Sequence, residues 1–177
     1  AVTDLAAYFD DEITAMPNLV TVGAANTLTT VAGIPFYQGD TGSIYTHNVS
    51  GTDSTAQYNT AYGLTALDAI TSGDNNTAIG NAALGANTSG GNNTAVGYEA
   101  LQSNTTAANN TALGRGSLQN NTTGASNVAV GFEALNANTT GTRNIAIGQN
   151  AYNSSDTEND NLAIGHDAMT TNTAGGT

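Results

Sequence analysis

The chain has 177 residues with no cysteine and no lysine, and its two arginines stand against 14 acidic residues, for a formal net charge of −12. The lack of cysteine excludes disulfides and thiol-ligated metals. The acidic balance argues against nucleic acid or an anionic membrane as a partner. No run of 18 apolar residues is present, so the sequence predicts no membrane-spanning helix.

Residues 1–58 are expected to form an attachment or shoulder region. A short helix is predicted over residues 4–16, which Asp4 can cap and Pro17 ends, with apolar residues at helical spacing at Leu5, Phe9, Ile13 and Met16. Two interpretations of this helix stay open: it packs on copies of itself or a docking partner, or it packs on its own chain.

The rest of this N-terminal region is predicted to be irregular and rich in strands. β-Branched residues between positions 19 and 34 predict strands, and irregular strands and loops are expected from there to residue 58. His47 has no second histidine and no cysteine nearby, which favours a surface or capping role over metal binding.

Residues 59–177 consist of seven units of 17 residues without insertion, each opening with Asn-x-Ala-x-Gly. The asparagines are Asn59, Asn76, Asn93, Asn110, Asn127, Asn144 and Asn161; the alanines are Ala61, Ala78, Ala95, Ala112, Ala129, Ala146 and Ala163; the glycines are Gly63, Gly80, Gly97, Gly114, Gly131, Gly148 and Gly165. A fixed period of this kind is typical of a solenoid in which each repeat stacks on the next. Terminal solenoid repeats are usually atypical. Because the seventh unit resembles its neighbours, we expect the native chain to continue.

The opening residues of each unit predict a short strand with asparagine and alanine on one face. The other face would present a larger apolar residue just before the glycine: Tyr62, Ile79, Val96, Leu113, Val130, Ile147 or Ile164. The glycine would turn the corner by positive φ or close backbone approach. A second apolar column follows it, at Leu67, Leu84, Leu101, Leu118, Leu135, Tyr152 and Met169, and an Asn-Thr-Thr-Gly-like turn closes most units.

This pattern predicts an all-β fold, a parallel β-solenoid or β-roll with one coil per unit. Coils should stack about 4.8 Å apart, so that seven of them make a rod segment roughly 30 Å long. Each asparagine side-chain amide is expected to bond the next along the axis, as in stacked amide ladders.

The small core of each unit predicts an oligomer. A coil offers only two to four large apolar side chains, each worth roughly 1.5–3 kcal/mol when buried, whereas ordering its backbone costs on the order of 1–2 kcal/mol per residue. An all-alanine face permits close approach of a neighbouring chain. We therefore predict a homotrimer whose chains share a core, with the alanine column at the contact.

Two segments carry a resemblance to a known family. Asn-Val-Ala-Val-Gly-Phe-Glu-Ala (residues 127–134) and Asn-Ile-Ala-Ile-Gly-Gln-Asn-Ala (residues 144–151) resemble the head repeats of trimeric autotransporter adhesins. That resemblance implies a trimeric, left-handed parallel β-roll. The longer unit with its Asn-Thr-Thr-Gly turn is similar to repeats in tail-fibre-like proteins of bacteriophages. The resemblance covers residues 59–177, and residues 1–58 match neither group.

Candidate sites for chemistry are few. Asp156, Glu158 and Asp160, followed by His166 and Asp167, suggest a calcium loop, but the turn glycine and the distal bidentate glutamate are missing, which favours a solvated acidic loop. Glycoside hydrolysis would need paired carboxylates in a groove. The repeats offer only the acidic residues just named together with Asp68, Asp74, Glu99 and Glu133, most of them a coil or more apart, and no tryptophan.

Two further interpretations are weaker. A threonine column suggests ice binding, but it belongs to a turn and is broken by Asp156; its members are Thr71, Thr88, Thr105, Thr122, Thr139 and Thr173. Asn75 and Asn104 lie in glycosylation sequons, which follow from the repeat itself. The sequence thus predicts no catalytic, cofactor or metal site.

From these observations we expect a structural fibre protein without catalytic activity. It would form a trimeric β-roll shaft or head on a virion surface, a phage fibre serving attachment or spacing. Expected partners are further copies of the chain, other virion proteins through residues 1–58, and a host-surface glycan or protein. The alternative is the head of a bacterial trimeric surface adhesin that binds host matrix or cells.

Overall fold

The computed structural model describes the backbone of four short strands before residue 55, and then residues 55–154 and 157–170. The predicted helix at residues 4–16 and His47 lie outside these described residues. The chain divides into two compact units, residues 1–37 and 38–177. In the first unit β1 (Thr30–Val31) pairs antiparallel with β2 (Ile34–Pro35). Strands were predicted in this stretch, and these two are found at its end.

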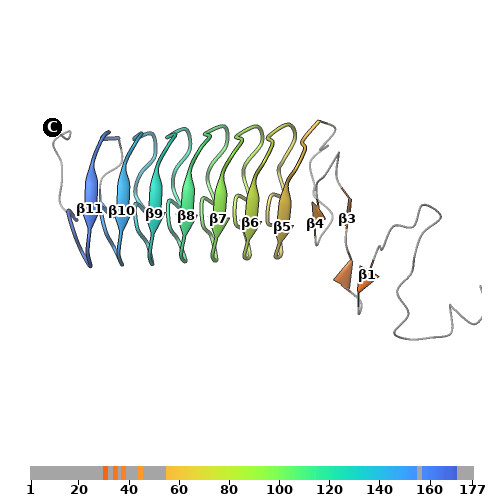
Figure 1. The fold of residues 1–177 in the computed structure, drawn as a ribbon, viewed down its shortest axis with the longest axis horizontal. Coiled ribbons are helices and arrows are strands. Elements are labelled where there is room, and N and C mark those ends of the chain that lie inside the picture. The colour runs from red at the N-terminus through yellow and green to blue at the C-terminus, as the bar shows by residue number, and fades with distance from the viewer. Residues whose placement is uncertain are drawn as a thin grey trace, which may run out of the picture. The chain divides into compact units, whose positions relative to one another are not determined.

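A nine-stranded sheet follows in which spatial order is sequence order, from β3 at one edge to β11 at the other. The strands are β3 (Tyr37–Gln38), β4 (Ile44–Tyr45), β5 (Thr60–Tyr62), β6 (Thr77–Ile79), β7 (Thr94–Val96), β8 (Thr111–Leu113), β9 (Val128–Val130), β10 (Ile145–Ile147) and β11 (Leu162–Ile164). From β4 onward each strand pairs in parallel with the next. Figure 1 shows β5 to β11 side by side, and a loop leads from the end of each strand from β5 to β10 to the start of the next.

The pairing confirms the predicted parallel β-solenoid with one coil per repeat unit. Ala95 pairs with Ala112, and Ala112 with Ala129, so equivalent residues of neighbouring coils are partners in the ladder. The seven strands from β5 to β11 bound six complete turns, and the seventh unit is described as far as residue 170. The stacking also includes β4, where Ile44 pairs with Thr60, so the parallel ladder begins before the first repeat unit.

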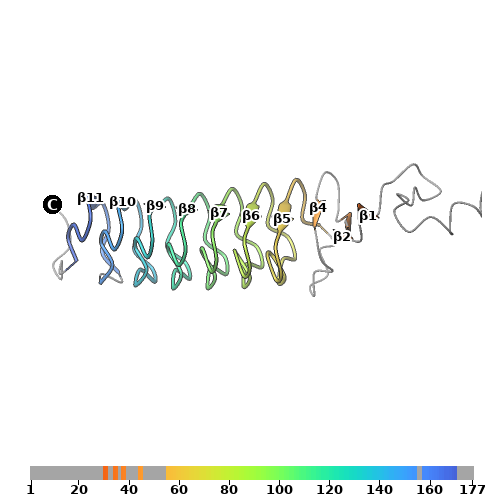
Figure 2. The ribbon, with the colours of Figure 1, turned by 90° about the horizontal axis from the view of Figure 1, so that it is seen from below.

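Hydrogen bonds between coils are not confined to the three-residue strands. Thr77 N–H donates to the Asn93 carbonyl (2.9 Å), Leu84 N–H to the Ala100 carbonyl (3.0 Å) and Thr88 N–H to the Thr105 carbonyl (2.9 Å). The turned view in Figure 2 shows the same coil path repeated along the row. Because each coil bonds its neighbours along its strand and its turns, a chain with very little regular secondary structure still satisfies its buried backbone.

The glycine that ends each strand from β5 to β10 is required by the next coil. The φ of Gly114 is 137°, and a Cβ built on it would lie 2.5 Å from the carbonyl oxygen of Gly131. Both the backbone conformation and the space therefore exclude a side chain. The predicted role of this glycine column, a corner with close backbone approach, is confirmed.

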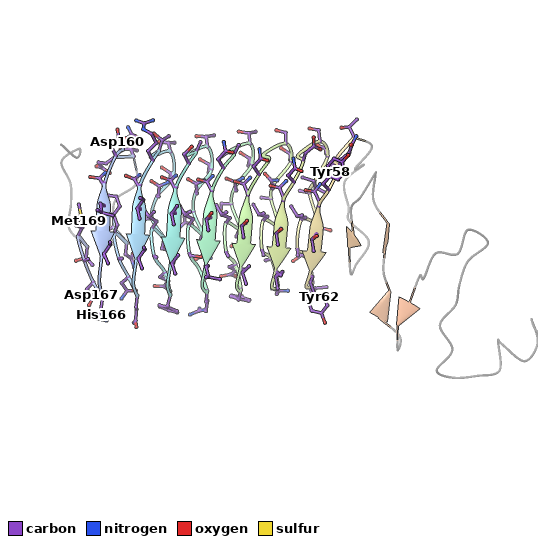
Figure 3. The ribbon with its side chains drawn as sticks, viewed as in Figure 1. Tyr58, Tyr62, Asp160, His166, Asp167 and Met169 are labelled. Carbon is purple, nitrogen blue, oxygen red and sulfur yellow. The ribbon has the colours of Figure 1, made fainter. Side chains whose placement is uncertain are left out.

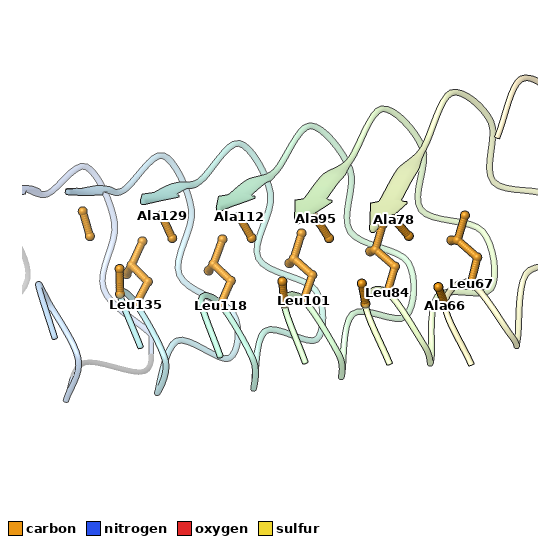
Figure 4. Close-up of a cluster of buried hydrophobic side chains, with 14 of the residues drawn as sticks. Ala66, Leu67, Ala78, Leu84, Ala95, Leu101, Ala112, Leu118, Ala129 and Leu135 are labelled. Atoms are coloured by element: carbon orange, nitrogen blue, oxygen red, sulfur yellow. The ribbon is translucent and has the colours of Figure 1, made fainter. Parts of the chain in front are cut away.

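Each coil has a narrow interior. The alanine of the strand and the leucine after the corner are buried and face one another across the coil, as Figure 4 shows for Ala112 and Leu118. A second small residue, Ala100 in the third unit, is buried beside the leucine. The leucines hold left-handed φ angles of 51–54°. This conformation costs about 1–2 kcal/mol for a residue with a Cβ, and burying the leucine offsets it.

One expectation about the strand faces is wrong. The alanine column does not face a neighbouring chain, because Ala112 and Ala129 are fully buried inside their own coils. The larger residues before the glycines lie on the other face, as predicted, and that face points outward: Ile147 is 39% exposed and Ile164 is 63% exposed. Strand alternation explains both results, because only one of two successive side chains can point inward and the narrow coil admits only the alanine.

Asparagine side chains bind the coils together from inside. The Oδ1 atom of Asn110 accepts the backbone N–H of Asn127 in the next coil (2.9 Å), and its Nδ2 donates to the Gly124 carbonyl (2.9 Å) near the end of its own coil. The same two bonds recur from Asn59 to Asn144. The stacked asparagine ladder is confirmed, but most of its bonds join side chain to backbone rather than amide to amide.

A second buried asparagine ladder runs through the turns of successive coils and meets the first ladder at a shared carbonyl. Its members are Asn87, Asn104, Asn121 and Asn138. Here each Nδ2 from Asn104 onward does bond the Oδ1 of the preceding coil, at 2.7–3.0 Å, and every member also bonds the carbonyl three positions later. One carbonyl per coil, such as that of Gly124, accepts from both ladders. Sequence reasoning treats these asparagines only as turn residues.

Candidate functional site

The outward side of β5 to β11, which we call the outer sheet face, carries two rows of uncharged side chains. The first row is Thr60, Thr77, Thr94, Thr111, Val128, Ile145 and Leu162, and the second is Tyr62, Ile79, Val96, Leu113, Val130, Ile147 and Ile164. No member of either row is buried. A continuous apolar strip is unusual on the surface of a chain with net charge −12, and exposed apolar patches commonly mark contact surfaces.

The outer sheet face becomes more apolar toward β11. The first row changes from threonine in β5 to β8 to valine, isoleucine and leucine in β9 to β11. Ile145 pairs with Leu162 and Ile147 with Ile164, which places four large aliphatic side chains together on two adjacent strands. All four are exposed in this single chain.

A second surface feature lies just beyond the corner glycines, where Tyr98, Arg115 and Phe132 follow one another in successive coils; we call them the aromatic strip. The guanidinium carbon of Arg115 lies 5.1 Å from the ring centroid of Phe132 and 5.8 Å from that of Tyr98. These distances are typical of cation–π contacts. Tyr98 and Phe132 remain 46% and 37% exposed. The neighbouring Glu99, by its hydrogen bond and its negative charge, raises the pKa of Tyr98.

Polar side chains form a rail beside the aromatic strip. Glu99 and Glu133 occupy equivalent positions two coils apart, and Gly116 holds that position between them. Gln119 Nε2 donates to Glu99 Oε2 (2.8 Å), and Asn136 Nδ2 donates to Gln119 Oε1 (3.0 Å). We refer to Glu99, Gln119, Glu133 and Asn136 as the glutamate–amide rail.

The acidic cluster predicted as a solvated loop is largely occupied by contacts within the chain. Arg143 binds Asp160 through Nε (2.6 Å) and Nη2 (2.8 Å), which lowers the pKa of the carboxyl and raises that of the guanidinium. Asp167 accepts from Asn150 Nδ2 (3.0 Å) and lies 3.0 Å from His166 Nδ1. These residues are on the surface near the last strand, as Figure 3 shows for Asp160, His166 and Asp167. Asp156 lies outside the described residues.

No group of three or more His, Asp or Glu side chains in the described part of the chain is arranged to hold a metal ion. The carboxylates considered for hydrolysis are dispersed. Asp74 Oδ1 accepts the Gln57 N–H (2.8 Å), and the Cα atoms of Glu99 and Glu133, two coils apart, would be roughly 10 Å apart at ordinary strand spacing. Asp68 lies in the same repeat unit as Asp74 and is partly exposed, and both are in a different coil from Glu99 and Glu133.

The threonine column has a structural role. Thr88 Oγ1 donates to the Thr105 carbonyl of the next coil (3.0 Å), and Thr71, Thr105 and Thr122 do the same in theirs. Their hydroxyls are thus hydrogen-bonded along the solenoid axis. Among the sequon asparagines, Asn75 is exposed whereas Asn104 is fully buried in the second ladder.

The asparagine, alanine and glycine positions that define the repeat are therefore interior or close-packed, and the side chains free to meet a partner lie elsewhere. No helix long and apolar enough to cross a membrane occurs in the part of the chain that the structure describes. Comparison with known proteins found no family profile, no curated protein and no solved structure that matches this chain.

Proposed function

We propose that this chain is a structural fibre protein that forms a homotrimeric, left-handed β-roll shaft or head on a virion surface, a phage fibre. It serves attachment or spacing and performs no catalysis. The observation that carries the proposal is the outer sheet face, an uncharged apolar strip that runs along a stack of coils in a strongly acidic chain.

Association of several chains would bury apolar side chains that a single chain leaves exposed. Most coils bury one large apolar side chain, such as Leu101 or Leu118, together with alanines and asparagines, and the first coil buries two, Leu67 and Ile70. The remaining large aliphatic residues, among them Ile147 and Ile164, stay exposed in a single chain. Burying each of them between chains contributes up to about 1.5–3 kcal/mol. Three copies that pack their outer sheet faces around one axis would bury all of these rows at once.

The remaining parts of the proposal rest on the sequence. Residues 1–58 would attach the trimer to other virion proteins, and the outward surfaces of the β-roll would meet a host-surface glycan or protein. A second candidate function is the head of a bacterial trimeric surface adhesin, which the Asn-Val-Ala-Val-Gly repeats favour. Both assignments use the same trimeric β-roll.

The test of the trimer is a mass measurement by multi-angle light scattering without denaturant. We expect a mass of three chains, and a variant carrying Ile145→Asp and Ile147→Asp should dissociate because it places charges within the contact. The matched control, Thr106→Asp with Thr123→Asp, adds the same charge at exposed turn positions and should remain trimeric. A native chain with the mass of one copy would contradict the proposal.

Mass spectrometry of the native full-length polypeptide separates phage fibre from adhesin. A distal receptor-binding or chaperone domain indicates the phage fibre. A coiled-coil stalk followed by a membrane β-anchor indicates the adhesin.

A further inference from the structure

We propose that the aromatic strip and the glutamate–amide rail together form a binding site for an uncharged oligosaccharide that lies along the solenoid axis. This inference rests on the proposed attachment role, for which it names the contact surface and the class of ligand. The site occupies the third to fifth repeat units and is distinct from the outer sheet face.

The two rings are exposed but held in place. Arg115 lies between Tyr98 and Phe132 and contacts both rings, at 5.8 and 5.1 Å. Each ring follows a corner glycine whose backbone is fixed by the next coil. Aromatic rings carry negative charge on their faces, to which the C–H groups of a sugar ring are attracted. Rigid, exposed rings offer this stacking surface with little loss of conformational entropy on binding.

Hydrogen-bonding groups beside the rings are available to a ligand. Among the described residues, no hydrogen bond or ion pair engages the guanidinium N–H groups of Arg115 or the carboxylate of Glu133. Gln119 and Asn136 are held by bonds to Glu99, Gln102 and Gly116. The surface thus presents donors and acceptors side by side. Sugar hydroxyls, which both donate and accept, can satisfy both kinds of group.

Charge selects against other ligands. Glu99 and Glu133 lie on one side of the strip, and the chain carries a net charge of −12, so a polyanion would be repelled. A cationic ligand is attracted by the net charge of −12 over the whole surface, but at the strip itself it meets the Arg115 guanidinium between the rings. An uncharged polyhydroxyl chain is repelled neither by the acidic side chains nor by the Arg115 guanidinium.

Spacing along the axis suits an extended chain. Tyr98 and Phe132 are two coils apart, so equivalent backbone atoms would be roughly 10 Å apart at ordinary strand spacing. Alternate sugars of an extended oligosaccharide could therefore stack on the two rings while the sugar between them lies over Arg115. The positions before and after the strip in the same column are Asn81 and Gln149, which bounds the site to three coils.

The test is a binding assay with the full chain on immobilised oligosaccharides of three kinds: uncharged hexose chains, sialylated or sulfated anionic chains, and cationic glucosamine chains. We expect binding to at least one uncharged kind and not to the anionic kind; any attraction of the cationic chains to the net charge should not depend on the two rings. The double variant Tyr98→Ala with Phe132→Ala should weaken that binding by about tenfold or more. Glu133→Ala, which removes one acceptor and leaves both rings, should also weaken it.

Two controls accompany these variants. Asn81→Ala with Gln149→Ala changes the same column outside the site and should bind as the native chain does. Tyr98→Phe with Phe132→Tyr keeps both rings and should retain binding, which separates stacking from a general loss of structure. Absence of binding to every uncharged chain, binding only to charged chains, or equal binding by the double alanine variant would overturn the inference.

Light scattering on the same samples distinguishes failure of this inference from failure of the proposed function. A trimer that binds no uncharged oligosaccharide contradicts only the binding site. A single chain that binds one contradicts the trimeric fibre and leaves the site in place.

Discussion

Asparagine is the residue that holds each coil closed and joins it to the next. Asn110 shows why no other residue replaces it in the first ladder: Oδ1 accepts from the Asn127 N–H, and Nδ2 donates to the Gly124 carbonyl, both at 2.9 Å. The side chain must therefore accept on one side and donate on the other, at one length. Aspartate has the length but not the donor, and glutamine has both groups but an additional methylene.

The first prediction tests this requirement through the substitution Asn110→Asp. The new carboxylate is buried and faces the Gly124 carbonyl, so burial raises its pKa above the unfolded value of about 3.9. A group whose folded pKa is raised stabilises the fold below the unfolded pKa, and this stability is lost as the pH rises through the folded pKa. Relative to the native chain, we expect a loss of about 3–5 kcal/mol at pH 7, and a much smaller loss near pH 4, where the protonated oxygen can donate to Gly124.

Urea denaturation of both chains at the two pH values measures this difference. Asn110→Ala is the control, because it removes both bonds without adding a titratable group and should lose stability equally at both pH values. If the loss for Asn110→Asp does not depend on pH, the carboxyl is not buried against the carbonyl.

At the residue scale, the sequence predicted where the corners of the coil lie but not every backbone conformation around them. The glycine column indicated a corner, and Gly114 has one, with both a positive φ and a neighbouring carbonyl in the way. The left-handed leucines could not be predicted, because leucine rarely adopts positive φ and only the packed coil shows that Leu118 must. The asparagines of the second ladder recur every 17 residues, as those of the first do, and this recurrence is the sequence feature from which the second ladder could have been predicted.

At the scale of the strand, alternation alone does not say which face is inside. A three-residue strand such as β9 presents Ala129 on one face and Val128 and Val130 on the other. Hydrophobicity alone would favour the valines for the interior. The coil is too narrow, because Leu135 and Ala134 already fill the space opposite Ala129. Size rather than hydrophobicity decides the inward face here.

The substitution Ala129→Leu tests the size of that interior. We expect it to cost about 1–3 kcal/mol, because additional methylenes in a well-packed core force neighbouring side chains and backbone apart. The sequence alone suggests a crowded contact between chains at this position, and the structure places the crowding inside the coil instead. Thermal melting measures the loss. Thr123→Leu, at an exposed turn position outside both the coil interior and the outer sheet face, is the control and should leave the melting temperature almost unchanged; equal melting of the two variants would mean that the alanine side has room.

The aromatic strip also becomes visible at this scale. Tyr98, Arg115 and Phe132 each follow the corner glycine of their own repeat unit, so reading the sequence down its columns places them in adjacent coils. The residue after the corner glycine varies from unit to unit, so the repeat pattern itself does not single out this column. Which variable column faces solvent depends on the φ angles of the corner, and these required the structure.

At the scale of the whole solenoid, stability is expected to be a sum of nearly identical terms. Each interior coil contacts only the coil before it and the coil after it, through the strand ladder, the asparagine ladders and the turns. Such repeat proteins behave as one-dimensional arrays, with an intrinsic term for each repeat and an interface term for each neighbour. Removing one complete coil should therefore shorten the array and leave the remaining contacts unchanged.

Deletion of residues 84–100 tests this prediction, because it removes the length of one whole repeat unit and joins Ala83 to Leu101, a junction equivalent to Ala100–Leu101. Every column stays in register, so we expect the same circular dichroism per residue and a cooperative unfolding transition. Deletion of residues 84–99 is the matched control. It falls short of a whole unit by a single residue, leaves one additional alanine at the corner and displaces Leu101 from its buried left-handed position. Losing that burial should make the control less stable than the whole-unit deletion by about 2–5 kcal/mol in urea denaturation. Equal stability of the two deletions would mean that the register of the repeat does not hold the coils together.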